Sequence, residues 1–287
     1  MTDSYPRISI IVAVLNGGKT LQRCIDSVVN QTYPYKELII MDGGSVDNSI
    51  DILKANEGNI TYWESKPDQG IYHAWNKALD HAHGDWIYFL GADDYLWSTD
   101  TLSQMVPHLN AAFLSVRIVY GSVAIVSTDG NILKVHGQPW PQIKKKFLNI
   151  MNCIHHQGVF HHRTLFQFHG RFDISFRILG DYEFLLRELK QNDAHFVDDI
   201  IVAGFQNTGL SSNPTNELLA LRETIIARKK HFGIKGFSLY FSSIYAKSFI
   251  KKTLSQTVGI KATNYIVDFY RVITGRPPIW TRQNNQK

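Results

Sequence analysis

The stretch D-W-I-Y-F-L-G-A-D-D, from Asp85 to Asp94, decides the predicted fold. Its residues from Trp86 to Gly91 are apolar, aromatic or small, which is typical of a strand buried on both faces. Two adjacent carboxylates, Asp93 and Asp94, follow at the carboxyl end, where ligands of open α/β sheets bind. Oxygen ligands suit Mg²⁺ or Mn²⁺, and a cation relieves the repulsion between two neighbouring charges. Alternatively, one carboxylate caps a following helix. This stretch alone leaves both interpretations open.

Strand and helix patterns alternate along the residues that precede this stretch. Apolar, β-rich runs predict strands over residues 8–15, 37–41 and 60–63, and helical spacing predicts helices over 19–30, 47–53 and 71–81. This alternation predicts a doubly wound α/β sheet. The later residues predict helices over 96–109, 163–169 and 178–191, a hairpin over 117–135, and strands over 155–161 and 195–205. The second half therefore adds antiparallel strands to a mixed sheet.

The composition is that of an ordinary globular protein. Hydrophobic residues make up 44% and charged residues 19% of the 287 residues. No apolar run approaches the roughly 18 residues that span a bilayer, and the amino-terminal residues lack a signal-peptide pattern. We therefore predict a cytoplasmic protein in which Cys24 and Cys153 are reduced.

The positive charge is concentrated near the carboxyl terminus. Residues 221–287 hold 13 Lys and Arg against two acidic residues, a net charge of +11, while residues 1–220 carry −6, consistent with the overall +5. We predict a domain over 1–212 and a basic helical extension over 213–287. Apolar residues at helical spacing mark this extension, in Phe237, Phe241, Tyr245 and Phe249 and again over 265–273. These helices either pack on protein or attach the chain to an anionic membrane surface.

Further polar residues follow the other predicted strands. Asp42 precedes two glycines, so its carboxylate either binds a nucleobase or ribose, or simply forms a turn. Gly70 lies at a helix start, where backbone N–H groups favour phosphate. The string Asn16-Gly17-Gly18 lacks the G-x-G-x-x-G spacing of dinucleotide-binding proteins.

Two later segments could contribute to the same site. Asp181, after Gly180, is either a helix N-cap or a general base, and Glu183 should face another direction. The tract H-H-Q-G-V-F-H-H over 155–162 does not match a zinc-enzyme pattern. On a strand it places His156 and His162 on one side, and the His156 imidazole is predicted to face phosphate or acceptor.

Taken together, five strings resemble glycosyltransferase family 2, the inverting enzymes with the GT-A fold, of the type that builds bacterial surface polysaccharides. In order, they are I-S-I-I-V-A-V-L-N, E-L-I-I-M-D-G-G-S-V-D, P-D-Q-G-I-Y-H-A-W-N-K-A, W-I-Y-F-L-G-A-D-D and I-L-G-D-Y-E-F-L-L-R, within residues 7–212. The resemblance implies transfer of a hexosyl or N-acetylhexosaminyl group from a nucleoside-diphosphate sugar, with a UDP-sugar favoured, to a saccharide or lipid-linked saccharide acceptor. The chain would then work at the inner face of the membrane.

The resemblance also assigns site residues. It implies Asp181 as the catalytic base and Asp93, helped by Asp94, as the ligand of Mg²⁺ or Mn²⁺. With Gly70 and His156 added from the arguments above, the predicted nucleotide-sugar site comprises Ala13, Asp42, Asp68, Gly70, Asn76, Asp93 and His156. Two positions depart from the family pattern, since Gly91 replaces the first Asp of D-x-D and Leu15 stands where some relatives carry an aromatic residue. The alternatives are an inactive nucleotide-sugar-binding module and a nucleic-acid-binding protein, although the basic segment lacks a nucleic-acid-binding motif.

Overall fold

The computed structural model describes residues 5–112, 115–127, 130–206, 216–233, 253–254 and 257–275. The chain divides into two compact units, Met1–Leu210 and Ser211–Lys287. The described helices of the second unit include α8 (Glu217–Phe232) and α10 (Ile260–Ile273). The predicted apolar stripe over 237–249 lies outside the described residues. Within the described residues, no helix is long and apolar enough to cross a membrane.

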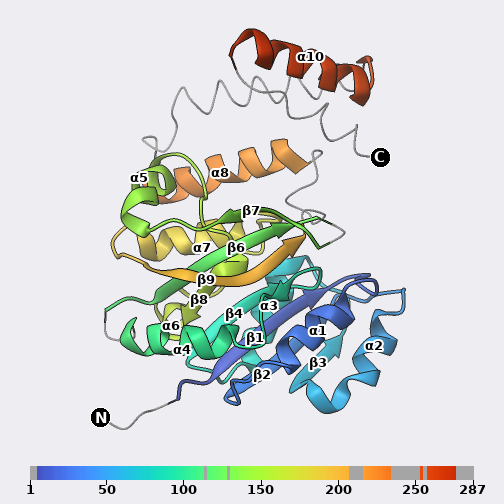
Figure 1. The fold of residues 1–287 in the computed structure, drawn as a ribbon, viewed down its shortest axis with the longest axis vertical. Helices are drawn as coiled ribbons and strands as arrows, with labels where there is room; N and C mark the ends of the chain where they lie inside the picture. Colours follow the sequence, from blue (N-terminus) through green and yellow to red (C-terminus); the bar gives the residue numbers. More distant parts are fainter. Residues whose placement is uncertain are drawn as a thin grey trace. The chain divides into compact units, whose positions relative to one another are not determined.

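The first unit is built on a mixed sheet with nine strands in its described part (Figure 1). Its strand order is β3-β2-β1-β4-β8-β6-β9-β5, and β7 pairs with β6. The strands are β1 (Ile8–Val14), β2 (Lys36–Asp42), β3 (Tyr62–Ser65), β4 (Trp86–Gly91), β5 (Tyr95–Leu96), β6 (Ile118–Val126), β7 (Ile132–His136), β8 (Val159–His162) and β9 (His195–Gln206). Strands β1 to β4 are parallel, whereas β8 runs antiparallel to both β4 and β6. The predicted α/β class, the β6–β7 hairpin and the mixed sheet are therefore confirmed.

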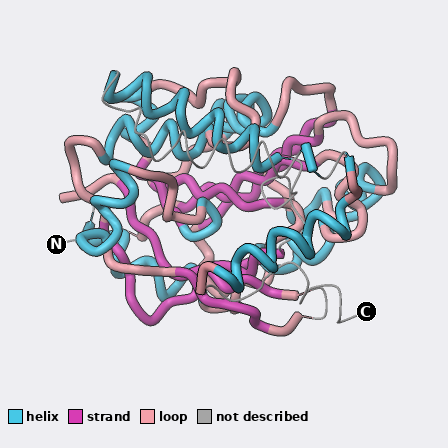
Figure 2. The backbone as a smooth tube through the Cα atoms, turned by 90° about the horizontal axis from the view of Figure 1, so that it is seen from above, coloured by secondary structure: helices cyan, strands magenta, loops and turns pink. Residues whose placement is uncertain are grey.

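Helices pack against both faces of this sheet, whose strands are drawn in magenta in Figure 2. On one face, α1, α2 and α4 share a hydrophobic core with Ile8, Ile10 and Val12 of β1. On the other face, Trp75 of α3 packs against Phe89 of β4, with 4.5 Å between the ring centroids. The helices are α1 (Leu21–Val29), α2 (Ser49–Ala55), α3 (Ile71–Ala78), α4 (Thr101–Ala112), α5 (Trp140–Asn149), α6 (Thr164–His169) and α7 (Gly180–Leu189).

The structure corrects two predictions from local patterns and adds one helix that those patterns did not predict. The helix expected over 96–109 begins only at Thr101, because Leu96 instead pairs with Ala203 of β9. The strand expected over 155–161 begins at Val159, since residues 156–158 form a 3₁₀ turn. Helix α5 was not predicted, although its buried residues Trp140, Ile143 and Phe147 recur at helical spacing.

The register of the parallel strands aligns their carboxyl ends. Ala13 pairs with Met41 of β2 and with Gly91 of β4, and Val14 pairs with Asp42. Three of the sequence segments singled out above therefore end at one edge of the sheet. We call this the carboxyl edge, meaning the ends of β1, β2 and β4 at Val14, Asp42 and Gly91.

Candidate active site

Asp93 and Asp94 lie on the turn that leaves β4 at the carboxyl edge. The Asp94 N–H donates to the Gly91 carbonyl at 3.0 Å, and the chain continues into β5 rather than into a helix. The helix-cap interpretation of these two carboxylates is therefore wrong. The reason is the pairing of Tyr95 with Gly204 of β9, which keeps the chain extended.

Both carboxylates converge on Gly91, the position that departs from the D-x-D pattern. A Cβ placed on Gly91 would lie 2.5 Å from Oδ2 of Asp94 and 2.9 Å from Oδ1 of Asp93. Together these distances limit the separation of the two oxygens to 5.4 Å. The Asp94 carboxylate thus occupies space that a side chain at residue 91 would need.

The surroundings of the two carboxylates are polar and include the guanidinium group of Arg23. Gln157 Nε2 donates to Asp94 Oδ2 at 3.0 Å, and Asp94 is only 1% exposed. Arg23 donates to the Asp93 backbone carbonyl at 2.7 Å. Burial raises the pKa of the Asp93 carboxyl above its ordinary value. Burial, followed by the charges of Asp94 and Asp93, also raises the pKa of the Cys24 thiol. A cation would lower the cost of this concentrated negative charge.

The donor set fits a hard divalent cation bound with a diphosphate. Mg²⁺ is usually held by one or two carboxylates, with substrate phosphates and waters completing its coordination. Among the described residues, no group of three or more His, Cys, Asp or Glu side chains is placed to hold a metal ion. The paired carboxylates of Asp93 and Asp94 therefore suit a cation that arrives with its nucleotide.

Asp42 organises the loop after β2. Its Oδ2 accepts hydrogen bonds from the Gly44 N–H at 3.0 Å, the Ser45 N–H at 2.9 Å and the Ser65 hydroxyl at 2.6 Å. The Ser45 hydroxyl also donates to Oδ1. Asp42 is 1% exposed, so its turn-forming role is shown directly. Contact with a nucleobase stays a prediction for this residue.

The loop after β1 is tied to the loop after β2. The N–H groups of Asn16, Gly17 and Gly18 donate to side chains of Ser45, Ser49 and Asp47, at 2.7, 3.0 and 2.9 Å. These N–H groups are therefore engaged within the protein. A dinucleotide-binding protein would instead direct such groups at a pyrophosphate.

Asp68 links the Asp42 loop to helix α3. Its Oδ1 accepts the Gly70 N–H at 2.8 Å, and its Oδ2 lies 2.6 Å from the position of a Cβ on Gly43. Gly70 has φ of +114°, a conformation that side chains other than glycine rarely adopt, and α3 begins at the next residue. The predicted positions Asp42, Asp68 and Gly70 are thus brought together.

Asp181 lies in the first turn of α7, and its carboxylate reaches α3. The cap residue of α7 is Leu179, so the interpretation of Asp181 as the N-cap is wrong. The Tyr72 hydroxyl lies 3.3 Å from Asp181 Oδ1, and Asn152 Nδ2 lies 3.4 Å from Oδ2. A Cβ on Gly180 would come within 2.7 Å of the Tyr72 ring, so this glycine permits the approach of the two helices.

Glu183 points elsewhere, as its spacing from Asp181 predicted. It is fully buried and forms an ion pair with Arg187, whose Nε lies 3.1 Å from Oε2. Arg187 also donates to the backbone carbonyls of His169 and Arg171. Glu183 is therefore part of the scaffold, which leaves Asp181 as the carboxylate of α7 that lies beside Tyr72.

Asn76 and His156 take different positions around Trp75. Asn76 Nδ2 donates to the Phe172 carbonyl and Asn76 Oδ1 accepts the Phe172 N–H, each at 2.9 Å, so this side chain supports the position of α3. The His156 ring lies 5.5 Å from the Trp75 ring, and its buried Nε2 has no hydrogen-bond partner among the described residues. Burial lowers the pKa of His156 to about 3, so its imidazole is neutral. Because His156 lies in a 3₁₀ turn rather than in a strand, the prediction that its side chain points to the same side of one strand as His162 is wrong.

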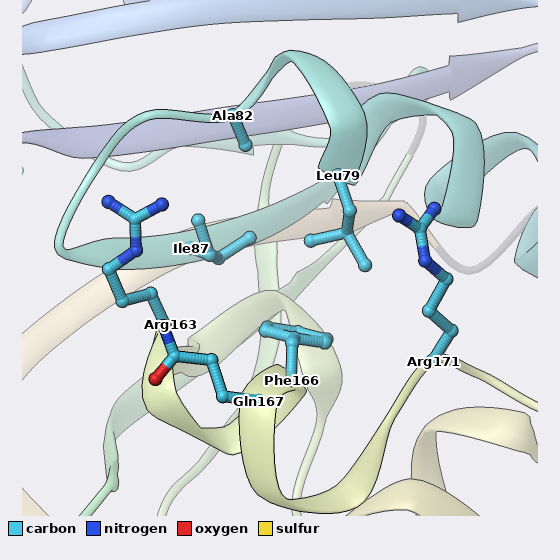
Figure 3. Close-up of a pocket in the computed structure, with 7 residues that line it drawn as sticks. All are labelled: Leu79, Ala82, Ile87, Arg163, Phe166, Gln167 and Arg171. Carbon is cyan, nitrogen blue, oxygen red and sulfur yellow. The ribbon is translucent and has the colours of Figure 1, made fainter.

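A separate pocket of about 180 Å³ lies near the start of β4, between α6 and the segment that follows α3 (Figure 3). Its apolar lining includes Ile87, near the start of β4, and two guanidinium groups flank it. Arg171 is paired with Asp80, and Arg163 donates to the His83 carbonyl at 3.1 Å. This pocket contains no carboxylate in its lining, and we do not assign the chemistry to it.

Sequence patterns did not identify the side chains that form hydrogen bonds with Asp181 and Asp94. Tyr72 bridges to Asp181 across 109 positions, and Gln157 bridges to Asp94 across 63. Asn152 was likewise missed. The available signals were modest: Tyr72 lies two residues after Gly70 on a predicted helix, and Gln157 lies within the histidine tract.

Comparisons with known proteins identify one family and solved structures of similar fold. The profile described as "Glycosyl transferase family 2" matches residues 9–170. A "PGL/p-HBAD biosynthesis glycosyltransferase" of Mycobacterium bovis is 32% identical over 231 residues, covering 78% of this chain and 82% of the relative. The structure of Staphylococcus aureus TarS 1-349 in complex with UDP-GlcNAc superposes with a TM-score of 0.62 at 15% identity, covering 87% and 73% of the two chains. The mannosyltransferase PcManGT of Pyrobaculum calidifontis, in complex with GDP-Man and Mn²⁺, gives 0.61 at 16% identity, with coverage of 96% and 78%.

Proposed function

The chain belongs to glycosyltransferase family 2 and is a nucleotide-sugar glycosyltransferase with a GT-A-like fold, and from that premise we propose that it transfers a sugar from a UDP-sugar to a saccharide hydroxyl with inversion. One observation carries this proposal. The carboxyl edge joins the Asp42 loop and the Asp93–Asp94 pair. Asp68 lies beside Gly43 and accepts the Gly70 N–H, and helix α3, which begins after Gly70, carries Tyr72 to 3.3 Å from Asp181.

The nucleotide would lie beside Ala13, Asp42 and Asp68. Two apolar side chains next to this loop support that placement, because Leu15 is 61% and Val46 is 91% exposed. Their loops are joined by a hydrogen bond of 2.9 Å from the Val46 N–H to the Asn16 side chain. An exposed apolar surface beside a buried carboxylate suits the flat face and polar edge of a nucleobase. The TarS complex with UDP-GlcNAc, which has a similar fold, favours a UDP-sugar.

The leaving group would be held at Asp93 and Asp94. A bound Mg²⁺ or Mn²⁺ supplies electrostatic stabilisation of the departing diphosphate. The protein's contribution is to keep two carboxylates within 5.4 Å of each other while Arg23 secures the Asp93 backbone. The PcManGT complex with GDP-Man and Mn²⁺ supports a divalent cation in this fold.

Asp181 would remove the proton of the acceptor hydroxyl as that oxygen attacks the anomeric carbon. Asn152 Nδ2 lies 3.4 Å from one carboxylate oxygen, and the Tyr72 hydroxyl, which donates to the Ile178 carbonyl at 2.7 Å, lies 3.3 Å from the other. These neighbours restrict the rotation of the Asp181 side chain. A positioned base of this kind contributes about 10²- to 10⁴-fold to rate. Attack from the face opposite to the leaving diphosphate inverts the configuration.

We further propose that the acceptor is lipid-linked and that α10 contacts an anionic membrane surface. Six large apolar residues on one side of α10 are between 47% and 68% exposed: Tyr265, Ile266, Phe269, Tyr270, Val272 and Ile273. The net charge of +11 over residues 221–287 complements anionic lipid headgroups. Flotation of the full chain with anionic liposomes tests this part, and equal flotation of a chain that ends at residue 212 would contradict it.

A thermal-shift screen of UDP-, GDP- and dTDP-sugars, with and without Mn²⁺, tests the enzymatic proposal. A ligand at 100 times its Kd stabilises the folded state by about 2.7 kcal/mol. We expect the largest increase in Tm with a UDP-sugar plus Mn²⁺, together with slow hydrolysis of that donor. Stabilisation without hydrolysis or transfer would instead favour the inactive binding module.

A further inference from the structure

Gln157 is held at two points between the sheet and the carboxylate pair. Its side-chain amide donates to Asp94 Oδ2 at 3.0 Å, and its backbone carbonyl accepts the Tyr88 hydroxyl at 2.6 Å. Gln157 is 4% exposed and Tyr88 is fully buried in β4. The amide group therefore approaches Asp94 from a position that is itself fixed to the strand preceding Asp94.

The place of Asp94 over Gly91 gives this hydrogen bond its importance. Asp94 Oδ2, the oxygen that Gln157 contacts, is also the oxygen 2.5 Å from the Cβ position of residue 91. The absence of a side chain at Gly91 thus makes room for Asp94, and Gln157 fixes it there. Asp93 Oδ1 also lies close to the Cβ position of residue 91, at a distance of 2.9 Å.

We propose that Gln157 is a positioning residue that orients Asp94 as the second carboxylate of the cation site, in place of the carboxylate that Gly91 lacks. This inference rests on the proposed metal-dependent function. A neutral amide suits the task, because it donates a hydrogen bond without adding positive charge. A Lys or Arg in the same position would neutralise Asp94 and compete with the cation. Hydrogen-bonding partners that orient metal ligands typically contribute 10- to 100-fold to metal affinity.

The variant Gln157→Met tests the proposal by removing the donor while keeping the length and volume of the side chain. Mn²⁺ binding is measured by electron paramagnetic resonance of free Mn²⁺ in the presence of saturating UDP. We expect a 10- to 100-fold weaker Mn²⁺ affinity, with UDP binding in the absence of metal unchanged. Because Gln157 acts through Asp94, Asp94→Asn in the Gln157→Met background should weaken Mn²⁺ binding much less than it does alone.

Gln31 offers a matched control. It is also a glutamine with 4% exposure, and its amide donates to the backbone carbonyls of Ser27 and Ser98 at 3.0 and 2.5 Å. Gln31→Met therefore removes buried hydrogen bonds that do not involve Asp94. It should lower Tm and leave Mn²⁺ affinity at the wild-type value.

Three results would overturn the proposal. The first is Mn²⁺ affinity of Gln157→Met within twofold of wild type, and the second is an equal loss in Gln31→Met, which would indicate a structural effect only. The third is wild-type protein that binds UDP but no Mn²⁺, which would remove the metal-dependent function together with this inference. If Gln157→Met does not fold, Gln157→Asn shortens the amide by one methylene and is subject to the same expected loss.

Discussion

Replacing Gly91 with alanine should destabilise the protein through Asp94. The added Cβ would lie 2.5 Å from Asp94 Oδ2, whereas ordinary van der Waals contact begins near 3.4 Å. The carboxylate must therefore retreat by about 0.9 Å, the difference of those two distances. Its hydrogen bond from Gln157, now 3.0 Å long, is then broken or severely weakened.

The size of the effect follows from two opposing contributions. A hydrogen bond to a charged group contributes about 1.5–3 kcal/mol. Replacing glycine with alanine raises the free energy of unfolding by about 0.4–1 kcal/mol, because it reduces the conformational entropy of the unfolded chain. The free energy of unfolding should therefore fall by about 1.5 kcal/mol, which corresponds to a Tm lower by roughly 3–6 °C for a domain of this size.

Thermal unfolding followed by circular dichroism checks this prediction, with Gly58→Ala as the matched control. No atom lies within 4 Å of a Cβ on Gly58, so that variant should be as stable as wild type or slightly more stable. If Gly91→Ala and Gly58→Ala unfold at the same temperature, the argument that Asp94 occupies the space over Gly91 is refuted.

Three further predictions concern the base, the buried histidines and the thiols. Asp181→Asn should bind the UDP-sugar with wild-type affinity in calorimetry yet lose transfer by at least about 10²-fold, and turnover at the wild-type rate would refute its assignment as the base. Burial lowers the pKa of His161 to about 4 in the folded state. Histidine in the unfolded chain has a pKa near 6.5, so the unfolded state takes up the proton first as pH falls. The contribution of His161 to stability is therefore constant above pH 6.5. Between pH 6.5 and about 4 the free energy of unfolding falls by up to about 1.4 kcal/mol per pH unit. His161→Phe, whose ring would join Phe89 and Phe166, should show a shallower decline in Tm between pH 7 and pH 5; an identical decline would contradict this account. Cys24 is fully buried with a raised thiol pKa, whereas Cys153 is partly exposed. A thiol reagent should therefore modify one cysteine in the native protein and both in denaturant, and rapid native labelling of two would be inconsistent with this structure.

The sequence predicted those features that depend on local patterns. Apolar runs such as Ile8–Val14 identify inner strands because both faces of such a strand are buried, and this property is repeated at every residue. The positions of Asp42 and Asp93 at strand ends followed from the same runs. The predicted pair of cation-binding carboxylates and the polar loops at the same edge of the sheet could be inferred in this way, because neighbouring parallel strands have their carboxyl ends at one edge.

Local patterns could not assign the partners of these side chains. Asp94 and Asp181 each had two interpretations in the sequence, as helix caps or as site residues. The cap interpretation of Asp94 was removed by β5 pairing with β9, and that of Asp181 by the start of α7 at Gly180. The turn at residues 156–158 likewise replaced a predicted strand. In each case, contacts with distant segments outweighed a local preference.

By itself, then, the sequence determined the α/β layer, the family and which strand ends share the edge that we propose for the chemistry, because burial periodicity and short motifs are written in neighbouring residues. Only the tertiary structure decided how the carboxylates are held. Tyr72 reaches Asp181, and Gln157 reaches Asp94 over Gly91, through hydrogen bonds between residues more than 60 positions apart. The geometry of such bonds depends on how α3, β4 and α7 pack, and no spacing along the chain encodes it.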